Sequence, residues 1–345
     1  MTAPRFARAF EIAGRQVGGG APCYVIAEAG VAHFGSIEKA CRLVDLASTA
    51  GADCVKFQHF KEDRLIGETS PEWRDRLRSR ELSDADMMRV RDAARGHGIP
   101  FLCTGHEERA LDFLDREAEV PAFKIGSGEV ENWPFLADIG RRGKPVILST
   151  GMYTIEQVAA ALDVLAESGC REVAVLHCVT AYPVAPKDVN LRVMQQIRGI
   201  FDGPVGYSDH TAGTAVPLAA VAMGAEVIEK HITLDVDVPN AQDWKVSCTA
   251  ETLPRFMADV REIEAALGDG ERRVSEVEQQ SIQWARKSLT SVVAIERGAL
   301  IRSDMLIGQR PGDGLPPSRI GEVVGRRARV AIPAGTKLSM DMLEG

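Results

Sequence analysis

Short, nearly continuous apolar runs recur along the first two thirds of the chain and predict the strands of a sheet. Eight of them are β-rich and have the length of buried strands. They lie at residues 23–30, 54–58, 100–105, 122–129, 145–151, 173–179, 204–210 and 226–233. Strands buried on both faces show continuous rather than alternating apolar patterns, so the runs favour a parallel sheet.

Helix signals separate these strands. The segments SIEKACRLVDLASTAG (36–51) and TIEQVAAALDVLAESG (154–169) each open on Ser or Thr, with glutamate close behind, and end on glycine. Eight strand–helix units in about 250 residues predict a closed (β/α)₈ TIM barrel. A doubly wound open sheet is the alternative, but no G-x-G-x-x-G follows the first strand, which argues against its dinucleotide-binding version.

The sequence changes character after about residue 267. Residues 268–284 are polar and charged, and they predict a linker or an exposed helix. Residues 285–345 are rich in short β-like runs, Gly and Pro, and they predict a separate small β domain. Its segments 296–306 and 333–343 resemble each other, which indicates a short structural duplication. The barrel, with an N-terminal extension, is therefore assigned to residues 1–267.

Composition narrows the class of protein. Hydrophobic residues make up 45% and charged residues 26%, as in soluble enzymes. The net charge of −8 suits neither nucleic acid nor an anionic membrane, although a locally basic pocket could still bind an anion. The seven cysteines include no C-x-x-C pair, the N-terminus has no apolar signal segment, and no run is long enough to span a membrane. We therefore expect a cytoplasmic protein with reduced cysteines.

Polar side chains gather where the predicted strands end. Because the carboxyl ends of barrel strands form the face that carries active sites, these side chains are expected to converge. In strand order the candidates are Glu28; Lys56 and Gln58; Thr104 and His106; Lys124, Ser127 and Glu129; Ser149 and Thr150; His177, Thr180 and Tyr182; Ser208, Asp209 and His210; and Glu229, Lys230 and His231.

Two of these residues, Lys56 and Lys124, follow apolar runs that place them in the barrel wall. Two lysines that face one cavity of an acidic protein require an anion, so we expect a phosphorylated or carboxylated ligand. Ser127, Ser149 and Ser208 can add neutral hydrogen-bond donors to phosphate oxygens.

Two histidines, His210 and His231, end adjacent strands. Their imidazoles could reach one divalent cation, or one ring could orient the other through a hydrogen bond. Asp209 and Glu229 could orient the imidazoles, or pair with nearby lysines instead.

Seven motifs along the barrel, taken in order, resemble the sialic acid synthase family. They are VIAEAG, GADCVKFQ, FKIGSGE, PVILSTGM, LHCVTAYP, GYSDHT and IEKHIT. RKSLTSVVAIERGALI and QRPGDGL resemble the C-terminal antifreeze-like (SAF) domain of the same family, so the resemblance covers roughly residues 20–345. Such synthases condense phosphoenolpyruvate with an N-acylated hexosamine, such as N-acetylmannosamine, to make nonulosonic acids. The resemblance therefore implies a metal-dependent transferase that forms a carbon–carbon bond and releases phosphate.

The resemblance also implies roles for individual residues. Those implied to bind phosphoenolpyruvate are Lys56, Lys124, Ser127, Ser149, Thr180, Tyr182 and Ser208. Those implied to act near the reacting carbons or to face the sugar and the metal are Glu129, Glu28 and Gln58. The implied ligands of the metal, Mn²⁺ or Mg²⁺, are His210 and His231. Asp243 is implied to bind the sugar, as is Arg310 from the small domain of a neighbouring subunit, so a domain-swapped homodimer is expected.

Several loops depart from the family pattern. The segments Ala32-His33-Phe34-Gly35, Thr104-Gly105-His106 and Ala241-Gln242-Asp243 differ from it, and Thr180 stands where the family commonly has Asn. The hypothesis is that this chain uses phosphoenolpyruvate as the family does but accepts a different sugar. Two alternatives remain. A condensation of the octulosonate type normally lacks a domain like residues 285–345, and a non-catalytic carbohydrate-binding protein would not need Lys124, Glu129, His210 and His231.

Overall fold

The computed structural model describes residues 5–239 and 241–345. The chain divides into two compact units, the first ending at Gly268 and the second beginning at Asp269. The prediction that the N-terminus has no signal segment includes residues 1–4, which lie outside the described residues. Within the described part of the chain, no helix has the length and apolar character needed to cross a membrane.

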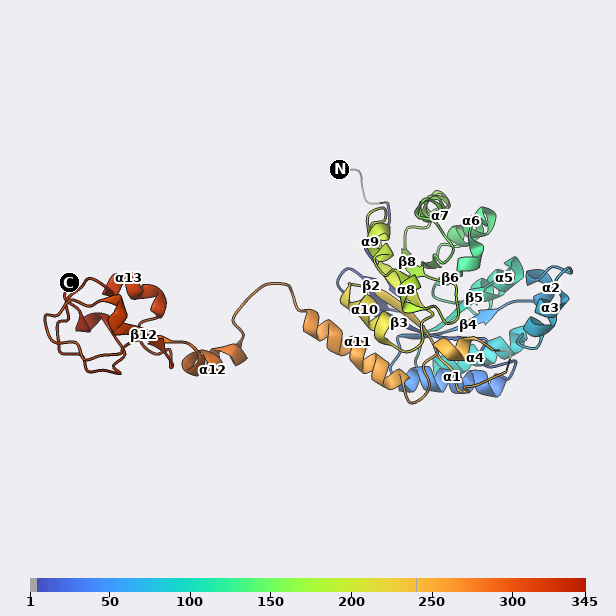
Figure 1. Ribbon diagram of the computed structural model, residues 1–345. Coiled ribbons are helices and arrows are strands. Elements are labelled where there is room, and N and C mark those ends of the chain that lie inside the picture. The colour runs from blue at the N-terminus through green and yellow to red at the C-terminus, as the bar shows by residue number, and fades with distance from the viewer. Residues whose placement is uncertain (1–4, 240) are drawn as a thin grey trace. The chain divides into compact units, whose positions relative to one another are not determined.

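Eight parallel strands form the centre of the first unit (Figure 1). They are β3 (Tyr24–Gly30), β4 (Cys54–His59), β5 (Phe101–Gly105), β6 (Phe123–Ile125), β7 (Val146–Ser149), β8 (Val173–Cys178), β9 (Val205–Asp209) and β10 (Val227–His231). Their order is β5-β4-β3-β10-β9-β8-β7-β6, and the two edge strands β5 and β6 lie against each other. This nearly closed barrel confirms the predicted TIM fold, and each strand coincides with one of the predicted apolar runs.

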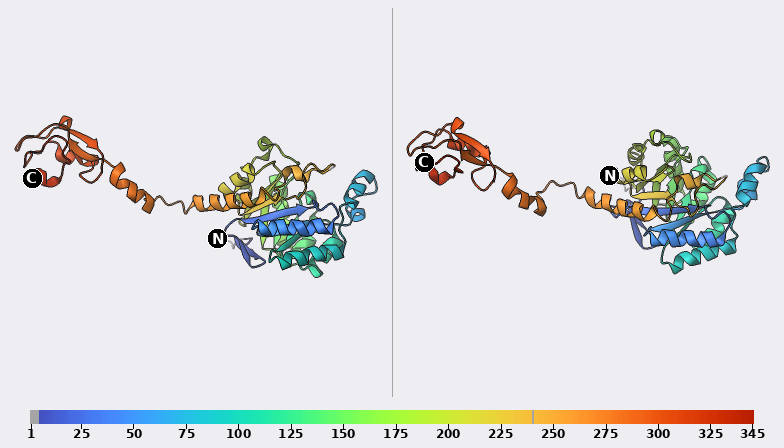
Figure 2. Two further views of the ribbon diagram at one scale, coloured as in Figure 1. Left: turned by 90° about the horizontal axis from the view of Figure 1, so that it is seen from below. Right: turned by 60° about the horizontal axis from the view of Figure 1, so that its bottom comes forward.

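Helices surround the strands (Figures 1 and 2). They are α1 (Ile37–Thr49), α2 (Glu62–Leu65), α3 (Pro71–Arg78), α4 (Asp84–Gly96), α5 (Glu108–Arg116), α6 (Trp133–Arg141), α7 (Ile155–Glu167), α8 (Pro186–Val189), α9 (Val193–Arg198), α10 (Ala215–Ala222) and α11 (Leu253–Leu267). The predicted helix starts are capped as their sequences suggest: Ser36 accepts a hydrogen bond from the Lys39 amide, and Thr154 forms a capping box with Gln157. Apolar faces, such as Leu162 and Leu165 of α7, are buried in the core around the strands.

The N-terminal extension folds into a hairpin of β1 (Ala9–Ile12) and β2 (Arg15–Gly18). Its side chains Phe10, Ile12 and Val17 join a buried cluster with residues from inside the barrel, among them Ile147 and Leu176. Those interior residues lie inside β7 and β8 and precede the polar residues at the strand ends. The hairpin therefore packs against the barrel interior away from the polar face, and we did not predict it from the sequence.

The second unit has its own small core of Leu289, Ile301, Leu338 and neighbouring apolar residues. It contains α12 (Glu276–Ala285), an antiparallel pair of β11 (Ser288–Ser291) and β12 (Leu306–Gln309), and α13 (Ile320–Val323). The two similar segments adopt matching structures, because each ends in a single 3₁₀ turn, at Ser303–Met305 and at Met340–Met342. Helix α12 covers part of the segment that we predicted to be a linker or an exposed helix.

Candidate active site

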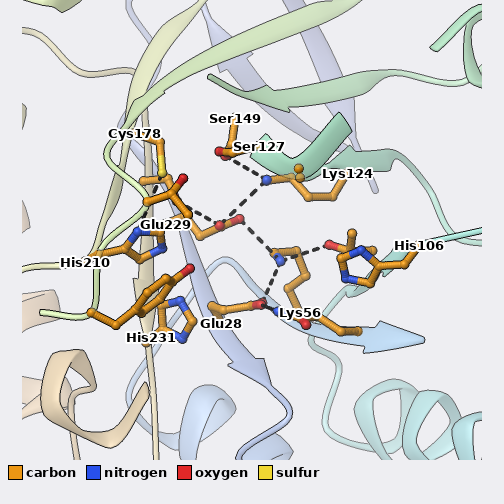
Figure 3. A pocket seen from close by; sticks show the side chains of 17 residues that line it. Glu28, Lys56, His106, Lys124, Ser127, Ser149, Cys178, His210, Glu229 and His231 are labelled. Atoms are coloured by element: carbon orange, nitrogen blue, oxygen red, sulfur yellow. Dashed lines mark hydrogen bonds and ion pairs between the residues drawn. The ribbon is translucent and has the colours of Figure 1, made fainter. Parts of the chain in front are cut away.

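A cavity of about 210 Å³ opens where the strands of the barrel end (Figure 3). Most of the residues predicted for the site line it: Glu28, Lys56, Gln58, Lys124, Ser127, Ser149, Thr180, Tyr182, Ser208, His210 and His231. They come from strands spread around the barrel and from the loops that follow them. The scattered strand ends therefore do meet in one place.

Strand register explains why the charged side chains face each other. Lys56 of β4 is paired with Glu28 of β3, and Glu229 of β10 is paired with Ser208 of β9. Residues paired in register point to the same face of a sheet, which for these four is the barrel interior. The two lysines and the two carboxylates consequently share one buried space.

The two lysines are almost fully buried, with 2% of Lys56 and 3% of Lys124 exposed. The ammonium of Lys124 donates hydrogen bonds to Ser149 Oγ at 2.7 Å and to the Ile125 carbonyl at 3.1 Å. The ammonium of Lys56 lies 2.7 Å from Glu28 Oε2 and donates to Thr104 Oγ1 at 3.2 Å. Burying two ammonium groups this close together is costly unless negative charge accompanies them.

Glu229 supplies part of that negative charge. Its carboxylate lies 3.6 Å from the Lys56 ammonium and 3.8 Å from the Lys124 ammonium, and its Oε1 accepts a hydrogen bond from Ser208 at 3.0 Å. Burial opposes ionisation, but the two lysines hold the pKa of Glu229 below its usual value. Both ion-pair distances exceed hydrogen-bond length, so Glu229 balances the lysines without saturating them.

The second carboxylate, Glu28, behaves differently. Burial raises its pKa above the usual value, and Lys56 only partly opposes that shift. Its Oε1 accepts a hydrogen bond from Gln58 Nε2 at 2.9 Å. Because burial favours its protonated form, Glu28 is a candidate for proton transfer. The pair of carboxylates therefore combines one fixed negative charge with one group suited to proton transfer.

Burial and the Lys56 charge together lower the pKa of Lys124, although Glu229 raises it. For Lys56 the balance is reversed. Burial lowers its pKa, but Glu229 and Glu28 together raise it above the usual value. At neutral pH the cavity thus holds a firmly charged Lys56 beside a Lys124 that loses its proton more readily than an exposed lysine would.

The next residues along β9 and β10, Asp209 and Lys230, face away from the cavity and form a buried ion pair of their own. Lys230 Nζ lies 2.5 Å from Asp209 Oδ2 and donates to the Thr211 carbonyl at 3.0 Å, while Tyr207 donates to Asp209 Oδ1 at 3.0 Å. Asp209 and Glu229 therefore pair with lysines, which was the second of the two roles considered for them. The pair fixes the strand ends that carry His210 and His231.

Replacing Lys230 by methionine is expected to lower the free energy of unfolding by about 3–5 kcal/mol, because it leaves the Asp209 carboxylate buried without its counter-charge. Urea denaturation followed by circular dichroism measures the change. Lys187→Met is the matched control, since Lys187 is exposed and its loss should cost less than about 0.5 kcal/mol. Equal stabilities of the two variants would show that the pair does not hold the strand ends.

The rings of His210 and His231 lie with their centroids 5.3 Å apart, and Tyr182 stacks on His210 at 4.0 Å. The Val179 carbonyl accepts a hydrogen bond from Nδ1 of His210 at 2.7 Å, which fixes the orientation of the ring. Burial lowers the pKa of His231, so its ring is neutral at pH 7. Two neighbouring imidazoles in one cavity fit the requirements of a divalent metal. Among the residues that the structure describes, no group of three or more His, Cys, Asp or Glu side chains forms a complete ligand set.

Three of the residues given a role by the family resemblance lie outside the cavity lining, as do the strand-end candidates Thr150, His177, Asp209 and Lys230. Glu129 ends a 3₁₀ turn (Ser127–Glu129) directly after the lining residues of the β6 loop, and it accepts a hydrogen bond from Asn132 at 2.7 Å. Asp243 begins the 3₁₀ turn Asp243–Val246 after β10. Arg310 belongs to the second unit, where its guanidinium lies 5.6 Å from the Trp284 ring. The roles implied for these three stay predictions.

Three cavity-lining residues were not among the predicted site residues: Gly126, Gly128 and Cys178. Cys178 ends β8 and points into the cavity, with its sulfur 3.7 Å from His210 Nδ1. Its apolar neighbours in VLHCV suggested an inert core cysteine. The sequence signal that could have found Cys178 is its position at the end of a predicted strand, where it is paired in register with Ser208 of β9.

Comparison with known proteins adds independent information. The NeuB family matches residues 43–272, and the SAF domain matches residues 286–344. The chain is 39% identical over 339 residues to N,N'-diacetyllegionaminic acid synthase of Legionella pneumophila, covering 93% of this chain and 95% of that protein. It is 35% identical over 353 residues to N-acetylneuraminate-9-phosphate synthase of Homo sapiens, covering 96% and 95%.

Among solved structures, the N-acetylneuraminic acid synthetase of Leptospira borgpetersenii in complex with citrate is similar, with a TM-score of 0.75 and 30% sequence identity. The match covers 80% of this chain and 95% of that one. The family matches thus cover the barrel and the small unit separately, and the relatives cover nearly the whole chain.

Proposed function

Since this chain belongs to the NeuB family, the nonulosonic acid synthases, we propose that it condenses phosphoenolpyruvate with the open-chain aldehyde of an N-acylated hexosamine. The family assignment confirms the resemblance inferred from the motifs. The reaction would depend on a divalent metal and release inorganic phosphate. The observation that supports it best is the pair of buried lysines, Lys56 and Lys124, in one cavity with several hydroxyl groups and the imidazoles of His210 and His231.

The lysines bind the anionic substrate in this proposal. Lys56 and Lys124 contact the phosphate and the carboxylate of phosphoenolpyruvate, and Ser127, Ser149 and Ser208 add hydrogen bonds to its oxygens. Because the ammonium groups are already held in place in a buried cavity, they stabilise phosphate charge without reorganising during the reaction. The ligand supplies the negative charge that the lysines need beyond what Glu229 provides.

The acceptor sugar is placed beside the two histidines. His210 and His231 would hold Mn²⁺ or Mg²⁺, which supplies Lewis-acid polarisation of the aldehyde oxygen. Carbon 3 of phosphoenolpyruvate attacks the aldehyde carbon and forms the new carbon–carbon bond. Carbon 2, left electron-deficient, takes a water molecule, and the resulting tetrahedral adduct breaks its bond to the phosphate oxygen and releases phosphate.

Proton transfer is assigned to Glu28. The attacking water must lose a proton, and Glu28 lines the cavity with a raised pKa and with Gln58 fixing one of its oxygens. Glu129, which the family resemblance implied for this region, lies outside the cavity lining beside Asn132.

Two alternatives have less support. A condensation of the octulosonate type would leave residues 286–344 without a counterpart, whereas these residues match the SAF domain. A non-catalytic carbohydrate-binding protein would gain nothing from two buried lysines.

We also propose a homodimer in which Arg310 reaches the cavity of the partner. This arm of the proposal rests on the family resemblance and on the exposed position of Arg310 in its own unit.

Release of phosphate tests the proposed function directly. Purified protein with Mn²⁺ and phosphoenolpyruvate should release phosphate only when an N-acylated hexosamine is present, and the product should have the mass of a nonulosonic acid. The reaction without a sugar, and the reaction with mannose in place of its N-acyl derivative, are the controls. Failure of every N-acylated hexosamine to exceed the rate without sugar would refute the proposal.

The acceptor itself is left open by the relatives. Their names include a diacetyllegionaminic acid synthase, a neuraminate-9-phosphate synthase and pseudaminic acid synthases, so the products in these names differ. The family resemblance implies that the loops in which this chain departs from the family pattern lie near the acceptor.

A further inference from the structure

A third histidine, His106, also lines the cavity at the ends of the strands. It follows Gly105, the last residue of β5, and belongs to residues 104–106, one of the segments that depart from the family pattern. In the part of the chain that the structure describes, no hydrogen bond reaches either nitrogen of its ring, and Figure 3 shows the ring without such a contact. An imidazole that faces a cavity with its polar atoms unused is available to a ligand.

The alternation of side chains along β5 explains why this ring faces the cavity. Thr104 points inwards and lines the cavity. Gly105 points outwards, because a Cβ at this position would lie 3.1 Å from the side chain of Leu111 in α5. The His106 amide donates a hydrogen bond to the His59 carbonyl of β4 at 3.2 Å, so the pairing of the two strands continues to this residue. His106 therefore points inwards again, on the same side as Thr104.

Two neighbours hold the His106 ring in place. The Phe60 ring meets it edge to face, with the ring centroids 6.2 Å apart. The backbone at Gly126 also lies close, because an added Cβ there would be 3.8 Å from His106 Cε1. Gly126 lies between Lys124 of β6 and Ser127, so the ring packs against the segment that supplies two of the groups proposed to bind phosphoenolpyruvate.

Strand order places His106 across the barrel from the proposed metal ligands. β5 lies opposite β9, because β4, β3 and β10 separate them on one side and β6, β7 and β8 separate them on the other. His210 follows β9, and His231 ends β10. Lys56 and Lys124 belong to β4 and β6, the two neighbours of β5. In Figure 3, His106 accordingly lies on the side of the cavity away from the other two histidines.

The His106 ring is neutral at pH 7. Burial, and then the charges of Lys56 and Lys124, lower its pKa to about 4. A neutral imidazole still carries one N–H that can donate a hydrogen bond. It thus adds a donor to the cavity without a third positive charge, which would be buried beside the two ammonium groups whenever no ligand is bound.

We propose that His106 is a further phosphoenolpyruvate-binding residue, whose ring N–H donates a hydrogen bond to an oxygen of the bound anion beside Lys56 and Lys124. This inference rests on the proposed function. The accepting oxygen belongs to the phosphate or to the carboxylate of phosphoenolpyruvate. The resemblance implied that the departing segments lie near the acceptor sugar, whereas this assignment puts residues 104–106 on the phosphoenolpyruvate side of the cavity.

Calorimetry of phosphoenolpyruvate binding tests the inference. His106→Phe keeps a ring of similar shape beside Phe60 but removes the N–H. It should weaken binding about tenfold or more, because a hydrogen bond to a charged group is lost. His106→Asn and His106→Gln place an amide N–H near the positions of Nδ1 and Nε2, and the variant that matches the donating nitrogen should recover binding to within about threefold of the unmodified protein.

His97→Phe is the matched control, because it makes the same substitution at a half-exposed histidine that does not line the cavity. It should bind phosphoenolpyruvate like the unmodified protein. Equal weakening by His106→Phe, His106→Asn and His106→Gln would show that the shape of the ring matters rather than its N–H, and would overturn the inference.

Inorganic phosphate is the probe that shows which end of phosphoenolpyruvate the ring contacts. If His106→Phe weakens the binding of inorganic phosphate as much as that of phosphoenolpyruvate, the ring donates to the phosphate. If only the binding of phosphoenolpyruvate is weakened, the ring donates to the carboxylate. Both results support a contact between His106 and the anion.

The outcomes separate this inference from the proposed function. If the unmodified protein binds no phosphoenolpyruvate, the proposed function itself fails. If it binds phosphoenolpyruvate and His106→Phe binds equally well, the function stands and the inference is wrong. Should the variants fail to fold, a crystal structure of the unmodified protein with phosphoenolpyruvate decides. A ring nitrogen of His106 within about 3.2 Å of a ligand oxygen supports the inference, and a separation above about 4 Å overturns it.

Discussion

Replacing Lys124 by methionine is expected to lower kcat/KM for phosphoenolpyruvate about a hundred- to thousandfold and to remove measurable binding in calorimetry. Methionine keeps much of the volume of the side chain but loses the ammonium that contacts Ser149 and Ile125. The cavity would then contain the Glu229 carboxylate beside a single lysine, and a multiply charged anion would lose half of its counter-charge. Binding is expected to weaken because the two lysines together balance the negative charge in the cavity.

The matched control is Lys187→Met, which removes an exposed lysine. It should bind phosphoenolpyruvate like the unmodified protein.

The pH dependence of phosphoenolpyruvate binding gives a second test. Because burial lowers the pKa of Lys124, its positive charge is lost as the pH rises through that lowered value, before an exposed lysine would lose its own. Affinity for phosphoenolpyruvate should therefore fall on the alkaline side, and normal binding by Lys124→Met would contradict the assignment.

Removal of divalent metal is expected to reduce turnover about a hundredfold or more, because Lewis-acid polarisation of a carbonyl is worth several kcal/mol. Binding of phosphoenolpyruvate should largely persist, since the lysines and serines hold it. Adding Mn²⁺ back should restore the chelated enzyme but not the variants His210→Ala and His231→Ala. The measurement is phosphate release before and after treatment with a chelator.

The control for these variants is His97→Ala, which removes a half-exposed histidine that pairs with Asp45. It should respond to chelator and Mn²⁺ like the unmodified enzyme. Undiminished turnover by the chelated enzyme would show that the two imidazoles serve only to position each other, which was the alternative considered for them. A loss of phosphoenolpyruvate binding in His231→Ala would instead place the histidines in the anion site.

The barrel strands could be predicted because burial on both faces leaves an unbroken apolar signal. Val173–Cys178 and Val227–His231 lie within the predicted runs, and their polar last residues mark the edge of the core. The hairpin of β1 and β2 was missed because each of its strands has only four residues, with exposed polar positions between apolar ones. Helix α3 was missed because its charged sequence has no buried residue.

The candidate site could be predicted where strand ends carry polar residues, as at Lys56, Ser208 and His231. It could not be predicted where position depends on loops. Glu129 follows a lining loop closely in sequence, but the 3₁₀ turn directs it to Asn132. The contact between Phe34 and Arg80 joins two different loops, so no local sequence pattern predicts it.

A crystal structure of the protein with phosphoenolpyruvate and Mn²⁺ tests the central claim most directly. We expect the phosphate and carboxylate oxygens within hydrogen-bond distance of the ammonium groups of Lys56 and Lys124, with the metal held by the two histidines. Phosphoenolpyruvate bound elsewhere, or Lys124 left in contact only with Ser149 and Glu229 while the ligand is present, would contradict the account.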